Sequence, residues 1–125
     1  MNTRSVLGIL VGVGVLLQIL LGELGFAAGS LRDLHATIGL AGLAVVAGYA
    51  YMSRGSKTIL ALTAIVLLVT ATQAVFGLSL YGLLNIGMNN EVLEINHRST
   101  AYLLLALGIA VSALTAVLRR KKIDT

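Results

Sequence analysis

Long runs of apolar residues, separated by short polar links, make up most of the chain. Four runs cover residues 5–22, 34–52, 58–80 and 99–118. Each is close to the ~20 residues that an α-helix needs to cross the hydrocarbon core of a bilayer. The runs are too long and too uniformly apolar for β-strands. Because backbone polar groups in lipid must be bonded within their own segment, the pattern predicts an all-α membrane protein with four transmembrane helices.

Polar residues in front of two of these runs predict where the helices begin. The segment from Ser30 to Asp33 has capping-box spacing, so the second helix is expected to start near residue 31. Asn89 and Asn90 precede Glu91, which is the arrangement of a cap followed by an acid in the first turn. The predicted helices of this single domain, residues 1–125, cover residues 5–22, 31–52, 58–80 and 91–118.

Composition and charge agree with a membrane protein. Only 11% of the residues are charged, whereas soluble domains carry about 25%. If the chain alternates across the membrane, most basic residues fall on one side: Arg4, Arg54, Lys57 and residues 119–122. The positive-inside rule then predicts that both termini lie in the cytoplasm. The chain is therefore expected to be a multi-pass protein of the plasma membrane. This distribution indicates a lipid bilayer as partner and argues against nucleic acid, and the absence of cysteine excludes thiolate ligands.

The two halves of the sequence resemble each other. A glutamine is followed four residues later by glycine in the first run (Gln18) and in the third (Gln73). A histidine is followed four residues later by Gly39 in the second helix, and by Ala101 in the fourth. The fold is therefore predicted to contain two repeated helical hairpins that run in the same direction.

Depth in the membrane brings four polar side chains into one layer. His35 and His97 lie in the first turns of helices that run inward from the outer face. Gln18 and Gln73 lie late in helices that run outward. All four are therefore expected near the outer face, and the two histidines are expected to face each other.

Two facing imidazoles suggest metal chemistry, since neutral imidazole binds both iron and zinc. A bare zinc ion would need further ligands, which Glu94, Glu91 or Asp33 can supply. A heme needs only two axial ligands from the protein, and four-helix interiors commonly hold such cofactors. The small residues Gly39 and Ala101 either let the helices pack closely or make room for the macrocycle.

Three charged residues near the histidines have two interpretations each. Arg32 and Arg98 either pair with heme propionates or extend towards the interface as isolated cations. Glu94, three residues before His97, is either a helix-start acid paired with Arg98 or a carboxylate that relays protons at the heme edge.

The segment Glu94-Ile-Asn-His97-Arg98-Ser-Thr-Ala101 and the two glutamine motifs resemble the heme A synthase family. Members usually contain two fused four-helix halves, each with a histidine pair in its second and fourth helices. One half holds heme b and the other takes heme O, whose methyl group is oxidised to formyl for respiratory oxidases. The resemblance implies that His35 and His97 ligate heme and that Glu94 is catalytic.

The chain departs from that family in length and in its lack of an outer-loop cysteine pair. One four-helix unit offers one histidine pair, so two copies would have to associate, or the function is reduced. The alternatives are a small b-type cytochrome that transfers electrons and a non-catalytic heme carrier or assembly subunit. A respiratory-chain electron donor and a heme O synthase are the protein partners that the resemblance implies.

Overall fold

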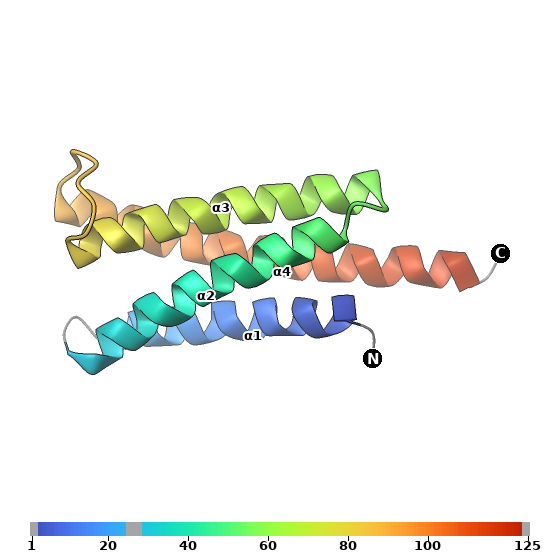
Figure 1. The fold of residues 1–125 in the computed structure, drawn as a ribbon, viewed down its shortest axis with the longest axis horizontal. Helices are drawn as coiled ribbons and strands as arrows, with labels where there is room; N and C mark the ends of the chain where they lie inside the picture. The colour runs from blue at the N-terminus through green and yellow to red at the C-terminus, as the bar shows by residue number, and fades with distance from the viewer. Residues whose placement is uncertain (1–2, 25–28, 124–125) are drawn as a thin grey trace.

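The computed structural model describes residues 3–24 and 29–123, and this part of the chain is helical (Figure 1). The helices are α1 (Thr3–Glu23), α2 (Ser30–Met52), α3 (Lys57–Tyr81) and α4 (Asn90–Ile123). The prediction of four helices and no strands is confirmed for these residues. The bounds agree closely except at the end of α4, which continues past the predicted residue 118.

Three of the described helices are long and apolar enough to cross a membrane. They are Ser30–Met52, Lys57–Tyr81 and the Asn90–Leu114 part of α4. The apolar part of α1, Gly8–Glu23, is shorter. Many large apolar side chains on these helices are exposed, including Val13, Leu20 and Leu68, which is the surface expected of helices that face lipid tails. The chain therefore has the form of a membrane helical bundle.

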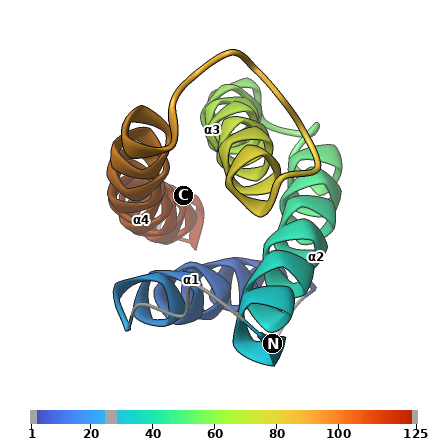
Figure 2. The same ribbon diagram turned by 90° about the vertical axis from the view of Figure 1, so that its left-hand side faces the viewer.

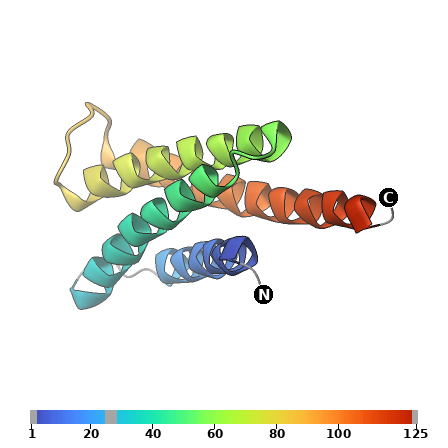
Figure 3. The same ribbon diagram turned by 45° about the vertical axis from the view of Figure 1, so that its right-hand side comes forward.

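The four helices form a ring in which each helix contacts two others. The contacting pairs are α1·α2, α2·α3, α3·α4 and α1·α4. Viewed along the bundle, the helices are arranged in a ring, and α2 crosses the others obliquely (Figures 2 and 3). The start of α1 and the end of α4 lie at the same end of the bundle (Figure 1). Consequently His35 and His97, which come early in α2 and α4, lie towards the other end.

The helix ends confirm one predicted cap and correct another. The Asn89 side chain accepts a hydrogen bond from the Val92 amide at 2.9 Å, so α4 has the predicted asparagine cap. The predicted Ser30 cap is wrong, since α2 begins at Ser30 and no side chain caps it. Gly29 precedes the helix with φ 76°, a conformation that glycine adopts without steric cost. The chain therefore enters α2 through a glycine turn.

The packed centre of the ring lies beyond the histidines, towards the cytoplasmic ends predicted from the sequence. A cluster of buried residues joins α2, α3 and α4, and consists of Val46, Val66, Leu104 and Val111. Val11 and Val15 of α1 pack against it. Side chains of the basic residues 119–122, on which the orientation prediction partly depends, lie outside what the structure describes.

Candidate functional site

The imidazole rings of His35 and His97 meet in the centre of the ring of helices. Their centroids are 5.9 Å apart and their planes are inclined by 69°. The two histidines belong to α2 and α4, which share no close backbone contacts among the described residues. The side chains therefore reach towards each other across the middle of the bundle, and the structure brings together the two residues that the sequence singled out.

Each histidine has a buried ring nitrogen without a hydrogen-bond partner. The Nδ1 atoms of His35 and His97 are the buried side-chain polar atoms that lack a partner in the described part of the chain. A buried polar group left unbonded costs about 1–3 kcal/mol, so such groups are rare in native structures. A ligand that accepts or binds at these nitrogens would remove that cost.

In contrast to the histidine nitrogens, the buried hydroxyl groups on α3 have hydrogen-bond partners. Thr63, Thr70 and Ser79 each donate a hydrogen bond to the backbone carbonyl four residues earlier, at 2.9, 2.7 and 2.9 Å. Since these groups are satisfied within their own helix, they need no ligand. The unpartnered atoms are thus concentrated at the histidine pair.

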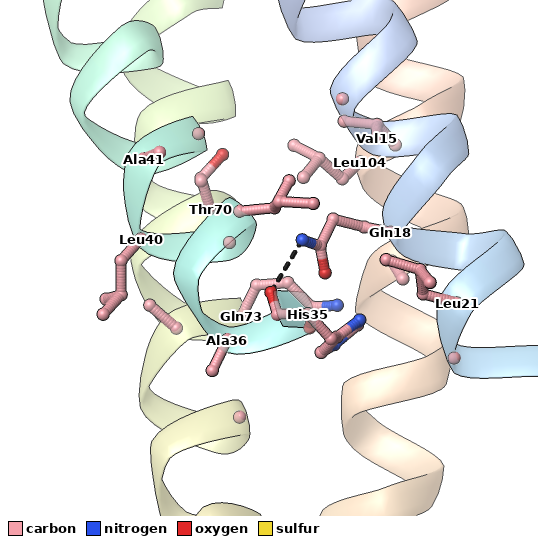
Figure 4. A pocket seen from close by; sticks show the side chains of 18 of the residues that line it. Val15, Gln18, Leu21, His35, Ala36, Leu40, Ala41, Thr70, Gln73 and Leu104 are labelled. Carbon is pink, nitrogen blue, oxygen red and sulfur yellow. Dashed lines mark hydrogen bonds between the residues drawn. The ribbon is translucent and has the colours of Figure 1, made fainter. Parts of the chain in front are cut away.

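A cavity of about 570 Å³ opens beside the two histidines, within the usual range for ligand pockets (Figure 4). All four helices contribute to its wall. The site residues predicted from the sequence that line it are Gln18, Arg32, His35, Gly39, Gln73, Glu94, His97 and Ala101. Arg98 is the predicted site residue that is not part of this wall.

Each glutamine connects the two helices of its own hairpin. The Gln18 side-chain amide donates to the backbone carbonyl of His35 at 2.8 Å, which ties α1 to α2 (Figure 4). The Gln73 side-chain oxygen accepts from the Thr100 hydroxyl, which ties α3 to α4. The glutamine side chains therefore fix the backbone near each histidine, and their bonds go to the His35 carbonyl and to Thr100 rather than to an imidazole.

At two glycines, the absence of a side chain lets a polar side chain from another helix come close to the backbone. A Cβ atom added to Gly77 would lie 3.2 Å from Cε1 of His97, which is tighter than nine in ten real Cβ contacts. One added to Gly39 would lie 3.8 Å from Nε2 of Gln18, an ordinary van der Waals distance. Gly77 is therefore the position where the His97 ring packs directly against α3. The spacing of Gln73 and Gly77 was visible in the sequence, but the contact between Gly77 and the His97 ring was not.

Arg98 is bonded to α1 and not to Glu94, which corrects one interpretation of that pair. Its Nε lies 3.0 Å from Oε1 of Glu23, and the Tyr102 hydroxyl donates to the same oxygen at 3.0 Å. Both charged side chains are about half exposed. This cluster fastens α4 to α1 at the end of the bundle that carries the histidines.

A second cluster fastens α2 to α3 at the same end. The Arg32 guanidinium lies 4.3 Å from the centre of the Tyr81 ring, and the Tyr81 hydroxyl donates to Asp33. The sequence did not single out Tyr81 or Tyr102 for these contacts. Such pairs depend on how each helix is rotated about its axis, which the linear pattern does not specify.

Glu94 lines the cavity and is also exposed. Its carboxylate has no hydrogen-bond or ion-pair partner among the residues that the structure describes. The group therefore has access both to water and to the space beside the histidines. A carboxylate in that position can carry a proton between water and the cavity.

The side chains available to bind a metal distinguish between a zinc site and a heme, the two kinds of metal centre that the sequence suggested. The described residues hold no group of three or more His, Cys, Asp or Glu side chains that could bind a metal ion, so a bare zinc site is not formed. A heme would need only one nitrogen from each of two histidines. His35 and His97, whose ring centroids are 5.9 Å apart, would be the residues that hold it.

The residues present therefore fit a bis-histidine heme better than any other metal centre considered. A search of protein-family models, of curated proteins and of solved structures finds no match to this chain, and its function is inferred from the geometry of the site.

Proposed function

We propose that the chain binds one heme between α2 and α4, with His35 and His97 as axial ligands. The observation that carries the proposal is the pair of buried, unpartnered imidazole nitrogens on rings 5.9 Å apart. When bound, a heme supplies an iron that changes oxidation state by one electron. Arg32, which lines the cavity and is exposed, is the better partner for a propionate, because Arg98 is already paired with Glu23.

The proposed membrane arrangement has all four helices crossing the bilayer, both termini in the cytoplasm and the heme near the outer face of the plasma membrane. It is supported by the positions of Arg54, in the link between α2 and α3, and Lys57, the first residue of α3. That link lies at the same end of the bundle as the start of α1 (Figure 1). Basic residues are enriched in cytoplasmic links, so the histidine end is the outer end.

The four helices are further proposed to be two copies of one hairpin. In the first, Gln18 of α1 bonds to α2, and in the second Gln73 of α3 bonds to α4. A histidine occupies the second helix of each hairpin. In both hairpins the glutamine of the first helix bonds to the second helix near its histidine, through the His35 carbonyl in one and the Thr100 hydroxyl in the other, which supports an origin of the fold in a repeated unit.

The activity proposed for this site is oxidation of the heme O methyl group to formyl, as in the heme A synthase family. The supporting observation is Glu94, an unpaired carboxylate in the wall of the same cavity as both histidines. It would accept a proton at its carboxylate oxygens and release it to water. Because the chain has only one histidine pair, the hypothesis includes association of two copies. The oxidation also needs O2 as oxidant and an external electron donor: one methyl group, two molecules of O2, four electrons from the donor and four protons give one formyl group and three molecules of water.

A b-type cytochrome is the second candidate, and one observation favours it. The chain contains no histidine besides His35 and His97. If both bind one iron, no further imidazole remains for a separate substrate heme. The expected function is then electron transfer without any change to the heme. Simple heme carriage is the remaining alternative.

Analysis of the bound pigment separates these functions. The protein is expressed in membranes that contain heme O, and the extracted heme is identified by mass. Appearance of heme A supports the synthase, whereas unaltered heme with a reversible redox couple supports the cytochrome and contradicts the synthase. Glu94→Gln is expected to retain heme and lose conversion. Glu91→Gln is the matched control, because Glu91 is exposed and does not line the cavity.

A further inference from the structure

The connection between α3 and α4 exposes an apolar surface at the histidine end of the bundle. It consists of residues 82–89, and Figure 2 shows it passing over α3 on the side of the ring away from α1. Large apolar side chains on this connection and at the start of α4 are exposed: Leu83, Leu84, Ile86, Met88, Val92 and Ile95. We call this set, together with Glu91 and Glu94, the outer patch.

Hydrogen bonds hold the connection in one shape. The Leu83 amide donates to the Leu78 carbonyl at 2.9 Å, which closes the end of α3. The Asn85 side chain accepts from the Gly87 amide at 2.9 Å, and the Asn89 side chain caps α4. A surface with a preformed shape loses little conformational freedom when a partner binds to it.

The length of α4 places the outer patch in water in the proposed membrane arrangement. The helix has 34 residues, about 51 Å at 1.5 Å per residue, whereas a bilayer with its headgroups is about 40–45 Å thick. Its apolar run begins at Ser99, so the turns from Asn90 to Arg98 rise about 13 Å above the hydrocarbon core. The headgroup layer on that side is only about 5–8 Å thick. The start of α4 therefore projects beyond the lipid.

The charges of the outer patch are negative and uncompensated. Residues 82–97 contain two acids, Glu91 and Glu94, and no lysine or arginine. Both acids are exposed, and neither forms an ion pair within the described part of the chain. The next basic residue, Arg98, is paired with Glu23. Apolar side chains beside unpaired carboxylates are complementary to a basic protein surface.

This charge pattern distinguishes three kinds of occupant. An anionic lipid surface attracts lysine and arginine, which the outer patch lacks. A second copy of the chain, related by a two-fold axis, would bring the same carboxylates together, and like charges across an interface are unfavourable. A water-soluble protein with basic residues around an apolar contact face complements both the apolar side chains and the carboxylates.

We propose that the outer patch docks a basic, water-soluble electron-carrier protein, which exchanges electrons with the heme held by His35 and His97. The inference rests on the proposed heme binding and names the chemistry of the electron partner. Glu94 belongs to the outer patch and also lines the histidine cavity, so a docked partner lies beside that cavity. One electron passes between the partner's metal centre and the heme iron, so that one is oxidised as the other is reduced. Small, electrostatically steered contacts are typical of such transient redox complexes.

Cytochrome c is the probe, because lysines surround the exposed edge of its heme. Heme-free protein is held in phosphatidylcholine nanodiscs, which carry no net charge, and its binding of cytochrome c is measured at low ionic strength. Glu91→Lys reverses one charge of the outer patch, and Leu83→Asn removes its most exposed apolar side chain. Leu24→Asn is the matched control for Leu83→Asn, because both leucines are 67% exposed and Leu24 follows α1 at the same end of the bundle.

The dissociation constant is expected to rise about tenfold in Glu91→Lys and in Leu83→Asn, and to stay within about twofold of wild type in Leu24→Asn. Wild-type nanodiscs that bind no more cytochrome c than empty ones overturn the inference, and so does unchanged binding by Glu91→Lys. Equal losses in Leu24→Asn and Leu83→Asn overturn it as well. A wild-type dimer that Leu83→Asn dissociates would assign the outer patch to a second copy, and binding in micelles but not in nanodiscs would assign it to lipid; either result overturns the inference.

Heme-loaded protein tests the redox role separately. When its heme is reduced and mixed with ferric cytochrome c, the second-order rate of heme oxidation should fall about tenfold in Glu91→Lys, while the heme spectrum stays that of wild type. An unchanged rate overturns the redox role of the outer patch. Protein that binds cytochrome c but takes up no heme contradicts the proposed function and leaves the docking surface intact.

Discussion

Replacing Gly77 by alanine tests the contact on which the orientation of His97 depends. The new Cβ would lie 3.2 Å from Cε1 of His97 and 3.9 Å from both ring nitrogens. The ring must therefore retreat by a few tenths of an ångström. Metal–nitrogen distances tolerate only about 0.2 Å. The displacement exceeds that tolerance, so the substitution is expected to weaken iron ligation.

Two opposing effects set the magnitude of this change. Overpacking a well-filled site costs about 1–3 kcal/mol. Replacing glycine by alanine within a helix gains up to about 1 kcal/mol, and less in a membrane, where the separated helices remain helical. The stability of the heme-free protein should therefore change little. The affinity for heme should fall by about tenfold, because only the bound state requires His97 in its original position.

Gly48→Ala is the matched control for this experiment. Its Cβ would meet no atom within 4 Å, and Gly48 does not line the histidine cavity, so heme affinity should stay within about twofold of wild type. The assay is a titration of detergent-solubilised, heme-free protein with hemin, followed by absorbance. Equal affinities for Gly77→Ala and the wild type would refute the inferred role of this contact.

Substitutions at three further positions probe two connections between helices and one helix cap. Gln18→Leu removes the hydrogen bond to the His35 carbonyl, and thermal unfolding of the heme-free protein should show a loss of about 1 kcal/mol. Glu23→Gln breaks the exposed pair with Arg98 and should cost less than about 1 kcal/mol in the same assay; a larger loss would mean that this cluster organises the bundle. Asn89→Ala removes the cap of α4, and about 1 kcal/mol should be lost, whereas Asn89→Asp should retain most of the stability.

The helices could be predicted from sequence because their signals are local. Apolar runs of membrane length and the Asn89 cap specify α4 without reference to the rest of the chain. The start of α2 was predicted less well. Its spacing from Ser30 to Asp33 suits a capping box, but Gly29 turns the chain in a conformation that no pattern of side chains encodes.

The meeting of the histidines was also predictable, because it depends on depth and on direction. Two helices that run the same way and carry a histidine in their first turns must place those residues in one layer. The partners of the neighbouring charges were not predictable in the same way. Arg98 bonds to Glu23, which lies on a different helix, and this contact depends on the rotation and crossing of α1 and α4.

The glutamines illustrate the same limit. Their positions in the repeat indicated a common role, yet not whether that role concerned a cofactor or another helix. In the structure Gln18 bonds to the backbone of His35 and Gln73 to Thr100, so both hold hairpins together. The contact between Gly77 and the His97 ring is a further consequence of packing between α3 and α4.

Reduced-minus-oxidised spectra of the purified protein test the central claim most directly. With His35 and His97 as axial ligands, the wild type should show the bands of one low-spin heme per chain. His35→Ala and His97→Ala should each lose these bands, while Gln18→Leu should keep them. A wild type without heme absorbance, or alanine variants with unchanged low-spin bands, would contradict ligation by these two histidines.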